Sequence, residues 1–319
     1  MASFLIRRIG HAALLLLVVS LIIFALVRVL PGDPVVTRLG AVAAAGSEEV
    51  VAQLRSELGL DKPLFEQYVA WLLGALQGDF GVSYSSQYPV SALIAQRLPA
   101  TVELAIAAIL IAILIAVPLS VASAIRPGSL LDRAASGLVT LGMAIPQFWL
   151  GILLVTVFSV TLGWLPARGY VEFREDPVAN LTLLVLPAVT LGVTLAAPLM
   201  RFLRSSLAEV SSSMYMRTAE GKGLRWGTAV IGHALPNALM PTLTFFGLLV
   251  GQLLGGVVLV EYVFGWPGLG SLTVSAISSR DYGVLQGVVL LLSAAFIIIN
   301  LLVDVAYGLI NPRVRVGAS

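Results

Sequence analysis

Residues 101–125 read TVELAIAAILIAILIAVPLSVASAI, and this stretch decides the class of fold. Glu103 is its only charged residue. A helix needs about 20 apolar residues in a row to cross the hydrocarbon core of a bilayer. Within that core the backbone must satisfy its own hydrogen bonds, so a run of this kind is expected to be helical. The stretch therefore predicts a membrane-spanning helix.

Similar runs recur along the chain. The set is 10–30, 101–125, 137–163, 181–203, 237–261 and 284–308. The composition agrees, with 58% hydrophobic and 11% charged residues and a mean hydropathy of +0.98. Soluble domains are typically about 25% charged. We therefore expect an all-α, polytopic membrane protein with six transmembrane helices.

The first run also has the pattern of a secretory signal peptide, which begins basic and continues apolar. Arg7 and Arg8 precede the run, and the alanines at 43–45 resemble a cleavage site. The apolar stretch is longer than a signal core, however, and the alanines lie well beyond its end. We therefore expect an uncleaved first helix.

Basic residues gather in the segments that would share one side of the membrane. These are the N-terminus, 126–136, 201–236 and the C-terminal tail, which together hold 11 Lys or Arg and 3 Asp or Glu. The remaining segments hold 8 basic and 13 acidic residues, with Asp304 assigned to the last span. Lys and Arg are retained on the cytoplasmic side. Both termini are therefore expected to be cytoplasmic.

Four parts follow from this arrangement. They are an N-terminal segment with the first helix (1–30), an external subdomain (31–100), a five-helix core (101–308) and a cytoplasmic tail (309–319). The external segment has helix-like stretches near 47–59 and 62–77, followed by the turn-rich GDFGVSY at 78–84.

Gly247, Gly251 and Gly255 repeat every four residues in the fifth run. This spacing places bare backbone on one stripe of a helix, where another helix can approach closely. The partner is either another helix of this chain or a second membrane subunit across a pathway, and the sequence leaves both alternatives open.

A long basic loop, 204–236, separates the fourth and fifth runs. A short helix is expected around 213–222, with Gly223 at the left-handed position that often ends a helix. Arg217, Lys222 and Arg225 give the loop its charge. Such a loop either anchors topology or docks on a partner.

The spacing of this loop resembles the conserved cytoplasmic loop of ABC-importer membrane subunits. That pattern is EAA, three residues, glycine, nine residues, then I-x-L-P. With the glycine at Gly223, the EAA positions are Arg217, Thr218 and Ala219, and the I-x-L-P positions include His233, Leu235 and Pro236. Ala219, Gly223, Leu235 and Pro236 match. The departures at Arg217, Thr218 and His233 resemble the variant R-T-A-x-x-K-G and H-A-L of the peptide and nickel branch.

Further blocks are similar to the dipeptide and oligopeptide permeases. They are FALVRVLPGDP (24–34), RLPATVELA (97–105), IPQFWLGILL (145–154) and VEYVFGWPGLG (260–270). With its extended segment after the first helix, the chain looks most like the B-type subunit.

The resemblance implies a type I importer fold in the bacterial inner membrane. It also implies a permease subunit of an ATP-driven dipeptide or oligopeptide importer, with nickel complexes as the alternative substrate. The implied partners are a second, C-type permease subunit, two ATPase subunits or domains, an external solute-binding protein and membrane lipid, and no nucleic acid. The residues expected to couple to an ATPase subunit are Tyr215, Met216, Arg217, Thr218, Ala219, Lys222 and Gly223, with His233, Leu235 and Pro236 at the loop end.

The chain is not expected to be an enzyme. A phosphate loop reads G-x-x-x-x-G-K-[ST], but Gly221 and Lys222 are followed by Gly223. ATP and magnesium would therefore be held by partner subunits, and this chain would hold no cofactor or metal. An ion-driven transporter is expected to carry paired polar groups at the membrane midplane. An intramembrane hydrolase is expected to carry a catalytic motif such as H-E-x-x-H. The predicted spans contain neither feature.

The predicted topology can be tested directly because the chain has no cysteine. We expect single cysteines at Val50 and Ser275 to react with an impermeant reagent in intact cells, and one at Glu220 to react only after permeabilisation. Labelling at Glu220 but not at Val50 would invert the orientation.

Overall fold

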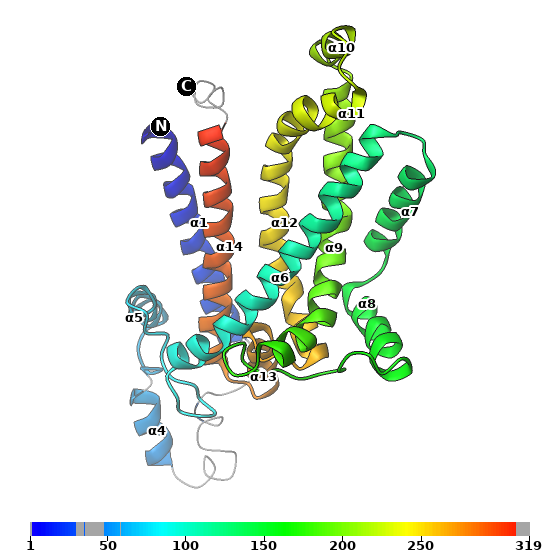
Figure 1. Cartoon of the computed structure of the whole chain (residues 1–319). Coiled ribbons are helices and arrows are strands. Elements are labelled where there is room, and N and C mark those ends of the chain that lie inside the picture. The colour runs from blue at the N-terminus through cyan, green and yellow to red at the C-terminus, as the bar shows by residue number, and fades with distance from the viewer. Residues whose placement is uncertain (1, 30–34, 36–47, 58, 311–319) are drawn as a thin grey trace. The chain divides into compact units, whose positions relative to one another are not determined.

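The computed structural model describes residues 2–29, 35, 48–57 and 59–310, which are largely helical (Figure 1). In chain order the helices are α1 (Ala2–Val29), α4 (Glu48–Glu57), α5 (Leu64–Leu76), α6 (Val90–Ile125), α7 (Leu130–Ala144), α8 (Gln147–Leu154), the π-helix η1 (Val155–Thr161), α9 (Pro177–Ser211), α10 (Met214–Gly221), α11 (Trp226–Ala229), the π-helix η2 (Val230–Ala234), α12 (Leu235–Phe264), α13 (Leu269–Ser278) and α14 (Tyr282–Ile310). The expected all-α class is confirmed. Residues 311–319 of the predicted tail and the alanines at 43–45 lie outside the described residues.

Five of the six predicted spans are continuous apolar helices. They are Ile6–Val29, Val90–Ile125, Pro177–Ser211, Trp226–Phe264 and Tyr282–Val305. The shorter helices α4 and α5 match those predicted near 47–59 and 62–77. Because α6 begins at Val90, the boundary predicted at residue 100 falls inside a helix.

The third predicted span, 137–163, is wrong as a single helix. After α7 ends at Ala144, the chain bends by 108° into the helical segment Gln147–Thr161. A proline pushes the residue before it out of the helical region, and Ile145 accordingly has a ψ of 125°. Pro146 then precedes the first turn of α8. The two pieces together have the length and apolarity of one broken span.

The chain divides into two compact units. Unit one comprises Met1–Arg8, Val102–Trp266 and Ile298–Ser319, and unit two comprises Ile9–Thr101 and Pro267–Ile297. Within unit one, Arg8 of α1 pairs with Asp304 of α14. This pairing explains how the last helix accommodates a carboxylate close to its apolar stretch.

Helix α9 is the most buried of the long helices, with 67% of its most apolar stretch inside the structure. Asp176 caps its start by accepting the N–H groups of Val178 and Ala179, both at 3.0 Å. Farther along, a Cβ on Gly192 would lie 2.6 Å from the side chain of Ile111 on α6, so the two backbones approach closely. The surrounding core holds Ala112, Ala116, Ala135, Leu195, Ala196, Leu199, Met200 and Leu249.

The glycines of the α12 stripe differ in their surroundings, and the structure supports the first predicted alternative, packing within the chain, for Gly247. Gly247 is buried, and a Cβ there would overlap with the side chain of Val303 on α14, so this glycine packs within the chain. Gly251 is also buried. Gly255 is exposed, and a Cβ there would meet no atom within 4 Å. The stripe is therefore an internal contact at one end and an open surface at the other.

In unit two, the buried carboxylate of Asp281 fastens the loop after α5 to the turn between α13 and α14. It accepts the backbone N–H groups of Tyr84 at 3.0 Å and Ser85 at 3.2 Å, together with the hydroxyls of Ser83 and Ser85. It also accepts the N–H of Val284 at 3.3 Å, in the first turn of α14.

Two glycines of α14 let this loop and the first residue of α6 lie directly on the helix. A Cβ on Gly283 would be 2.8 Å from the carbonyl oxygen of Val82, and one on Gly287 would be 2.8 Å from Cγ1 of Val90. The loop and the helix are thus held by both packing and hydrogen bonds.

The Asp281 carboxylate should keep its hold on the loop in mildly acidic solution. Burial by itself would raise its pKa, but the hydrogen bonds from Ser83, Ser85 and Tyr84 outweigh burial and lower the pKa below its usual value. Since the folded pKa lies below the unfolded one, the stabilisation is complete above the ordinary value of about 3.9 and is lost as the pH falls through the lower folded value.

We expect Asp281→Ala to speed amide exchange in residues 82–90 by about tenfold or more, because each buried donor left unsatisfied costs about 1–3 kcal/mol. Asp79→Ala is the control, since its exposed carboxylate accepts one bond from Gly81 at 2.9 Å. Equal exchange in the two variants would show that Asp281 does not hold the loop.

Candidate coupling site

Helix α10 follows α9 and precedes α11 along the chain. In Figure 1 it lies beyond the ends of both helices. Its bounds, Met214–Gly221, confirm the short helix predicted around 213–222. The segment that follows leads through α11 and η2 into α12, so α10 is held at both ends by elements of unit one.

One face of α10 packs into the protein. Met216 is fully buried and Ala219 is 8% exposed. Residues three apart lie on the same side of a helix. Their cluster is completed by Leu203, Leu207, Ala229, Ala234 and Ala238, with Leu235 and Trp226 packed against it. These two predicted coupling residues are therefore anchors whose side chains face their own core.

The other face of α10 is open. Tyr215 is 44% exposed, and the side chains of Arg217, Thr218 and Lys222 are exposed as well. Arg225 follows just beyond the helix and is also exposed. These four predicted coupling side chains thus form a polar surface with a net positive charge, although Glu220 of the same helix is exposed as well.

The end of α10 depends on Gly223. This residue has a φ of 85°, in the left-handed region where glycine is favoured. Its N–H donates to the carbonyl of Glu220 at 2.8 Å, and the N–H of Leu224 donates to the carbonyl of Ala219 at 3.2 Å. The pair of bonds is a Schellman motif, which satisfies carbonyls that a helix end leaves without partners. The predicted role of Gly223 as a helix terminator is confirmed.

Of the three predicted loop-end residues, His233 lies in the π-helical segment η2, and Leu235 and Pro236 begin α12. His233 is exposed, and Pro236 occupies the first turn of α12. Proline removes a backbone donor, and local π geometry can re-satisfy the ladder. Here the N–H of Leu235 bonds to the carbonyl of Val230, and the amide of Asn237 donates to the carbonyl of His233 at 2.7 Å.

Two side-chain bonds tie this region to neighbouring helices. The indole N–H of Trp226 donates to the carbonyl of Ala124 at 3.2 Å, in the last turn of α6. The hydroxyl of Ser206 on α9 donates to the carbonyl of Ala238 on α12 at 3.2 Å. The α10 cluster is therefore joined to α6, α9 and α12.

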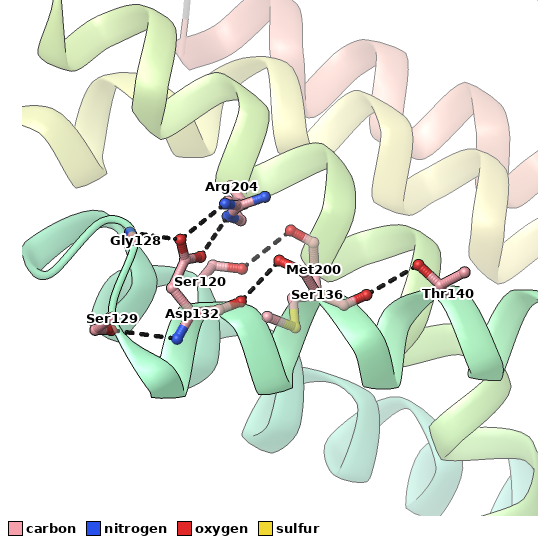
Figure 2. A network of polar contacts seen from close by, with 8 residues as sticks. All are labelled: Ser120, Gly128, Ser129, Asp132, Ser136, Thr140, Met200 and Arg204. Carbon is pink, nitrogen blue, oxygen red and sulfur yellow. Dashed lines mark hydrogen bonds and ion pairs between the residues drawn. The ribbon is translucent and has the colours of Figure 1, made fainter.

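An ion pair joins α9 to α7, as Figure 2 shows. Nε of Arg204 lies 2.8 Å from Oδ1 of Asp132, and Nη2 donates to Oδ2 at 3.0 Å. The buried carboxylate also accepts the N–H of Gly128 at 2.9 Å, while Ser129 caps the N–H of Asp132 at 3.3 Å. This two-point geometry holds the start of α7 against α9, and charge-assisted pairs of this kind are the stronger ones.

Asp132, Arg204 and Trp226 are not among the residues that the sequence patterns select. A signal for one of them is present, because Ser129 and Asp132 have the spacing of a helix-start motif. The partner of Asp132, however, is 72 residues away. Figure 2 also shows the hydroxyl of Ser120 donating to the carbonyl of Met200, a contact that joins α6 to α9 at 3.2 Å.

Metal chemistry has no visible support in the part of the chain that the structure describes, since no three His, Asp or Glu side chains there could share an ion. Fold and site together define a multi-pass membrane protein with a short helix that is anchored on one face and exposed on the other.

Comparison with known proteins agrees with this class. Residues 116–316 match the family described as binding-protein-dependent transport system inner membrane component, and residues 1–105 match the corresponding N-terminal family. The chain is 39% identical over 338 residues to the dipeptide transport system permease protein DppB of Escherichia coli strain K12, with 99% of each chain covered. It is 42% identical over 315 residues to the glutathione transport system permease protein GsiC of Salmonella choleraesuis, again with 99% of each covered.

Among solved structures, an inward-facing form of the MetNI methionine ABC transporter matches with a TM-score of 0.58 at 19% identity. The match covers 69% of this chain and 96% of that one. It supports the expected fold of a type I ABC-importer permease. The chain belongs to the family of binding-protein-dependent transport system inner membrane components.

The ion pair between α7 and α9 leads to a prediction. We expect Arg204→Gln to destabilise the purified complex by about 1 kcal/mol, at the low end for a bond to a buried charge because Arg204 is partly exposed. Arg201→Gln is the matched control, one turn earlier on α9 and without an ion pair among the described residues. Thermal unfolding in detergent measures both, and equal midpoints would contradict a stabilising role for the pair.

Proposed function

We propose that this chain is the permease subunit of an ATP-driven peptide importer and forms half of its translocation pathway. Full-length relatives are named for dipeptide, peptide and glutathione transport. Those names support peptides over the nickel complexes that the sequence resemblance also allows. The location that goes with this function is the bacterial inner membrane, with both termini and α10 on the cytoplasmic side.

Partner proteins supply the other components of the importer. A second, C-type permease subunit completes the pathway, an external binding protein delivers the peptide, and two ATPase subunits or domains bind ATP and magnesium. This chain contributes no catalytic group and couples their hydrolysis to movement of the pathway.

The observation that carries the proposal is the two-sided construction of α10. Met216 and Ala219 fix the helix to the bundle, while Tyr215, Arg217, Thr218 and Lys222 remain exposed. A helix that only marked topology would need basic charge but no buried anchor. An ATPase subunit with acidic residues at its surface fits the exposed face.

Force applied to α10 would spread through specific contacts. The buried cluster links α10 to α9 and α12. From α9 it reaches α7 through the Arg204–Asp132 pair and α6 through the Ser120–Met200 bond. A shift of α10 on ATP binding would therefore move several helices together, which is what alternating access requires.

The test is the cap of α10 in the complete transporter. At Gly223 a Cβ would meet no atom within 4 Å, so a side chain there acts through backbone strain alone. A left-handed conformation costs an L-residue roughly 1–2 kcal/mol, and a β-branched side chain worsens it. We expect Gly223→Val to lower peptide-stimulated ATP hydrolysis and uptake by about tenfold, the rate equivalent of about 1.4 kcal/mol.

Gly221→Ala is the control, because Gly221 is the last residue of the same helix and also has open space around a Cβ. Alanine is favoured within helices, so this variant should keep both activities. Both complexes are reconstituted in liposomes with binding protein, peptide and ATP. If the Gly223→Val complex assembles and keeps the parental rates of ATP hydrolysis and uptake, the loop does not couple the two activities and only fixes the topology.

A further inference from the structure

Helix α5 is apolar, yet none of its residues is fully buried. Its sequence, LFEQYVAWLLGAL, has one charged residue in 13. Phe65, Leu73 and Leu76 are 76%, 54% and 77% exposed. With Val69 they fall at intervals of four, four and three residues, so they form one stripe along the helix. An apolar stripe of this kind is rarely left facing water.

The opposite face of α5 is fastened to α1. Phe24 of α1 contacts Tyr68 and Trp71 of α5, with ring centroids 5.4 Å and 6.1 Å apart. The hydroxyl of Ser20 donates to the carbonyl of Leu17 at 2.8 Å and lies 2.9 Å from the hydroxyl of Tyr68. Since Ser20 uses its own proton on Leu17, Tyr68 is the donor in the second bond.

These contacts fix how far α5 sits from the end of α1. A helix rises about 1.5 Å per residue, so Ser20 is about 13 Å before Val29 along the axis. Arg28, near that end, lies with its guanidinium 5.1 Å from the centre of the Phe24 ring. An arginine at the end of a span reaches the interface while its stem stays in apolar surroundings. Ser20 and Phe24 then lie below the headgroups, and Tyr68 and Trp71 lie at the same depth.

The surface of α1 beside this contact already faces lipid. Leu17, Leu21 and Leu26 are each about half exposed on a helix long and apolar enough to cross the membrane. The apolar stripe belongs to the helix that packs on α1 at this level. Apolar helices of about 10–14 residues are too short to span and are often interfacial, and Tyr and Trp are enriched at that depth.

We propose that α5 is an interfacial helix whose stripe of Phe65, Val69, Leu73 and Leu76 is embedded in lipid acyl chains, in the leaflet at the C-terminal end of α1. The segment between α1 and α6 thus includes a membrane-bound element that anchors unit two to lipid in addition to its spanning helices. The inference is independent of the transported substrate.

The cysteine-free chain allows a direct test in the complete transporter reconstituted in vesicles. Nitroxide labels are placed singly at Phe65→Cys and Leu73→Cys on the stripe and at Gln67→Cys on the far side of the same helix. Collisions with oxygen, which partitions into lipid, are compared with collisions with a water-soluble nickel chelate. Leu14→Cys on α1 gives the lipid reference and Asp61→Cys gives the water reference. Each labelled complex must retain parental uptake.

We expect the oxygen-to-nickel collision ratio at Phe65 and Leu73 to approach that at Leu14 and to exceed that at Gln67 several-fold. Ratios like that at Asp61 would place the stripe in water and overturn the proposal. Low collision rates with both reagents would mean that a protein subunit covers the stripe, which would equally overturn it.

Discussion

Close approach between α9 and its neighbours is the constraint on which unit one depends. Lipid is as apolar as a leucine side chain, so helices in a bilayer gain little from hydrophobic burial and associate through close packing. Gly192 allows α9 to reach Ile111 of α6, and Ala196 and Ala197 are buried nearby on the same helix. A bulkier residue at Gly192 would separate two backbones and every contact around them.

The packing of α9 also explains how α10 is held against the bundle. The C-terminal part of α9 carries Leu203 and Leu207 into the cluster under α10, while Arg204, between them in sequence, turns towards Asp132 of α7. One helical turn therefore serves two neighbours. The buried residues thus fix the position of α10, and its exposed residues are not constrained by this packing.

Much of this architecture can be predicted from the sequence, for physical reasons that differ from one element to the next. Long apolar runs give the spans because the bilayer imposes one length on all of them. Gly223 could be assigned as a helix end because few residues tolerate a positive φ. The break before Pro146 could not, because proline is compatible with either a kink or a full stop inside a membrane helix. Which face of α10 is buried also had to come from tertiary packing, since the helix is only eight residues long. The Asp281 contacts join residues almost 200 positions apart, and no local pattern records them.

The bend between α7 and α8 has a consequence for what can surround it. A helix that stops within the membrane leaves carbonyl groups of its last turn without the usual donors, and acyl chains cannot supply any. Such backbone is tolerated only against protein or water. The corner at Ala144–Gln147 joins two helices that both pack on α9. Any part of this corner within the hydrocarbon layer has to be shielded from acyl chains by protein or water.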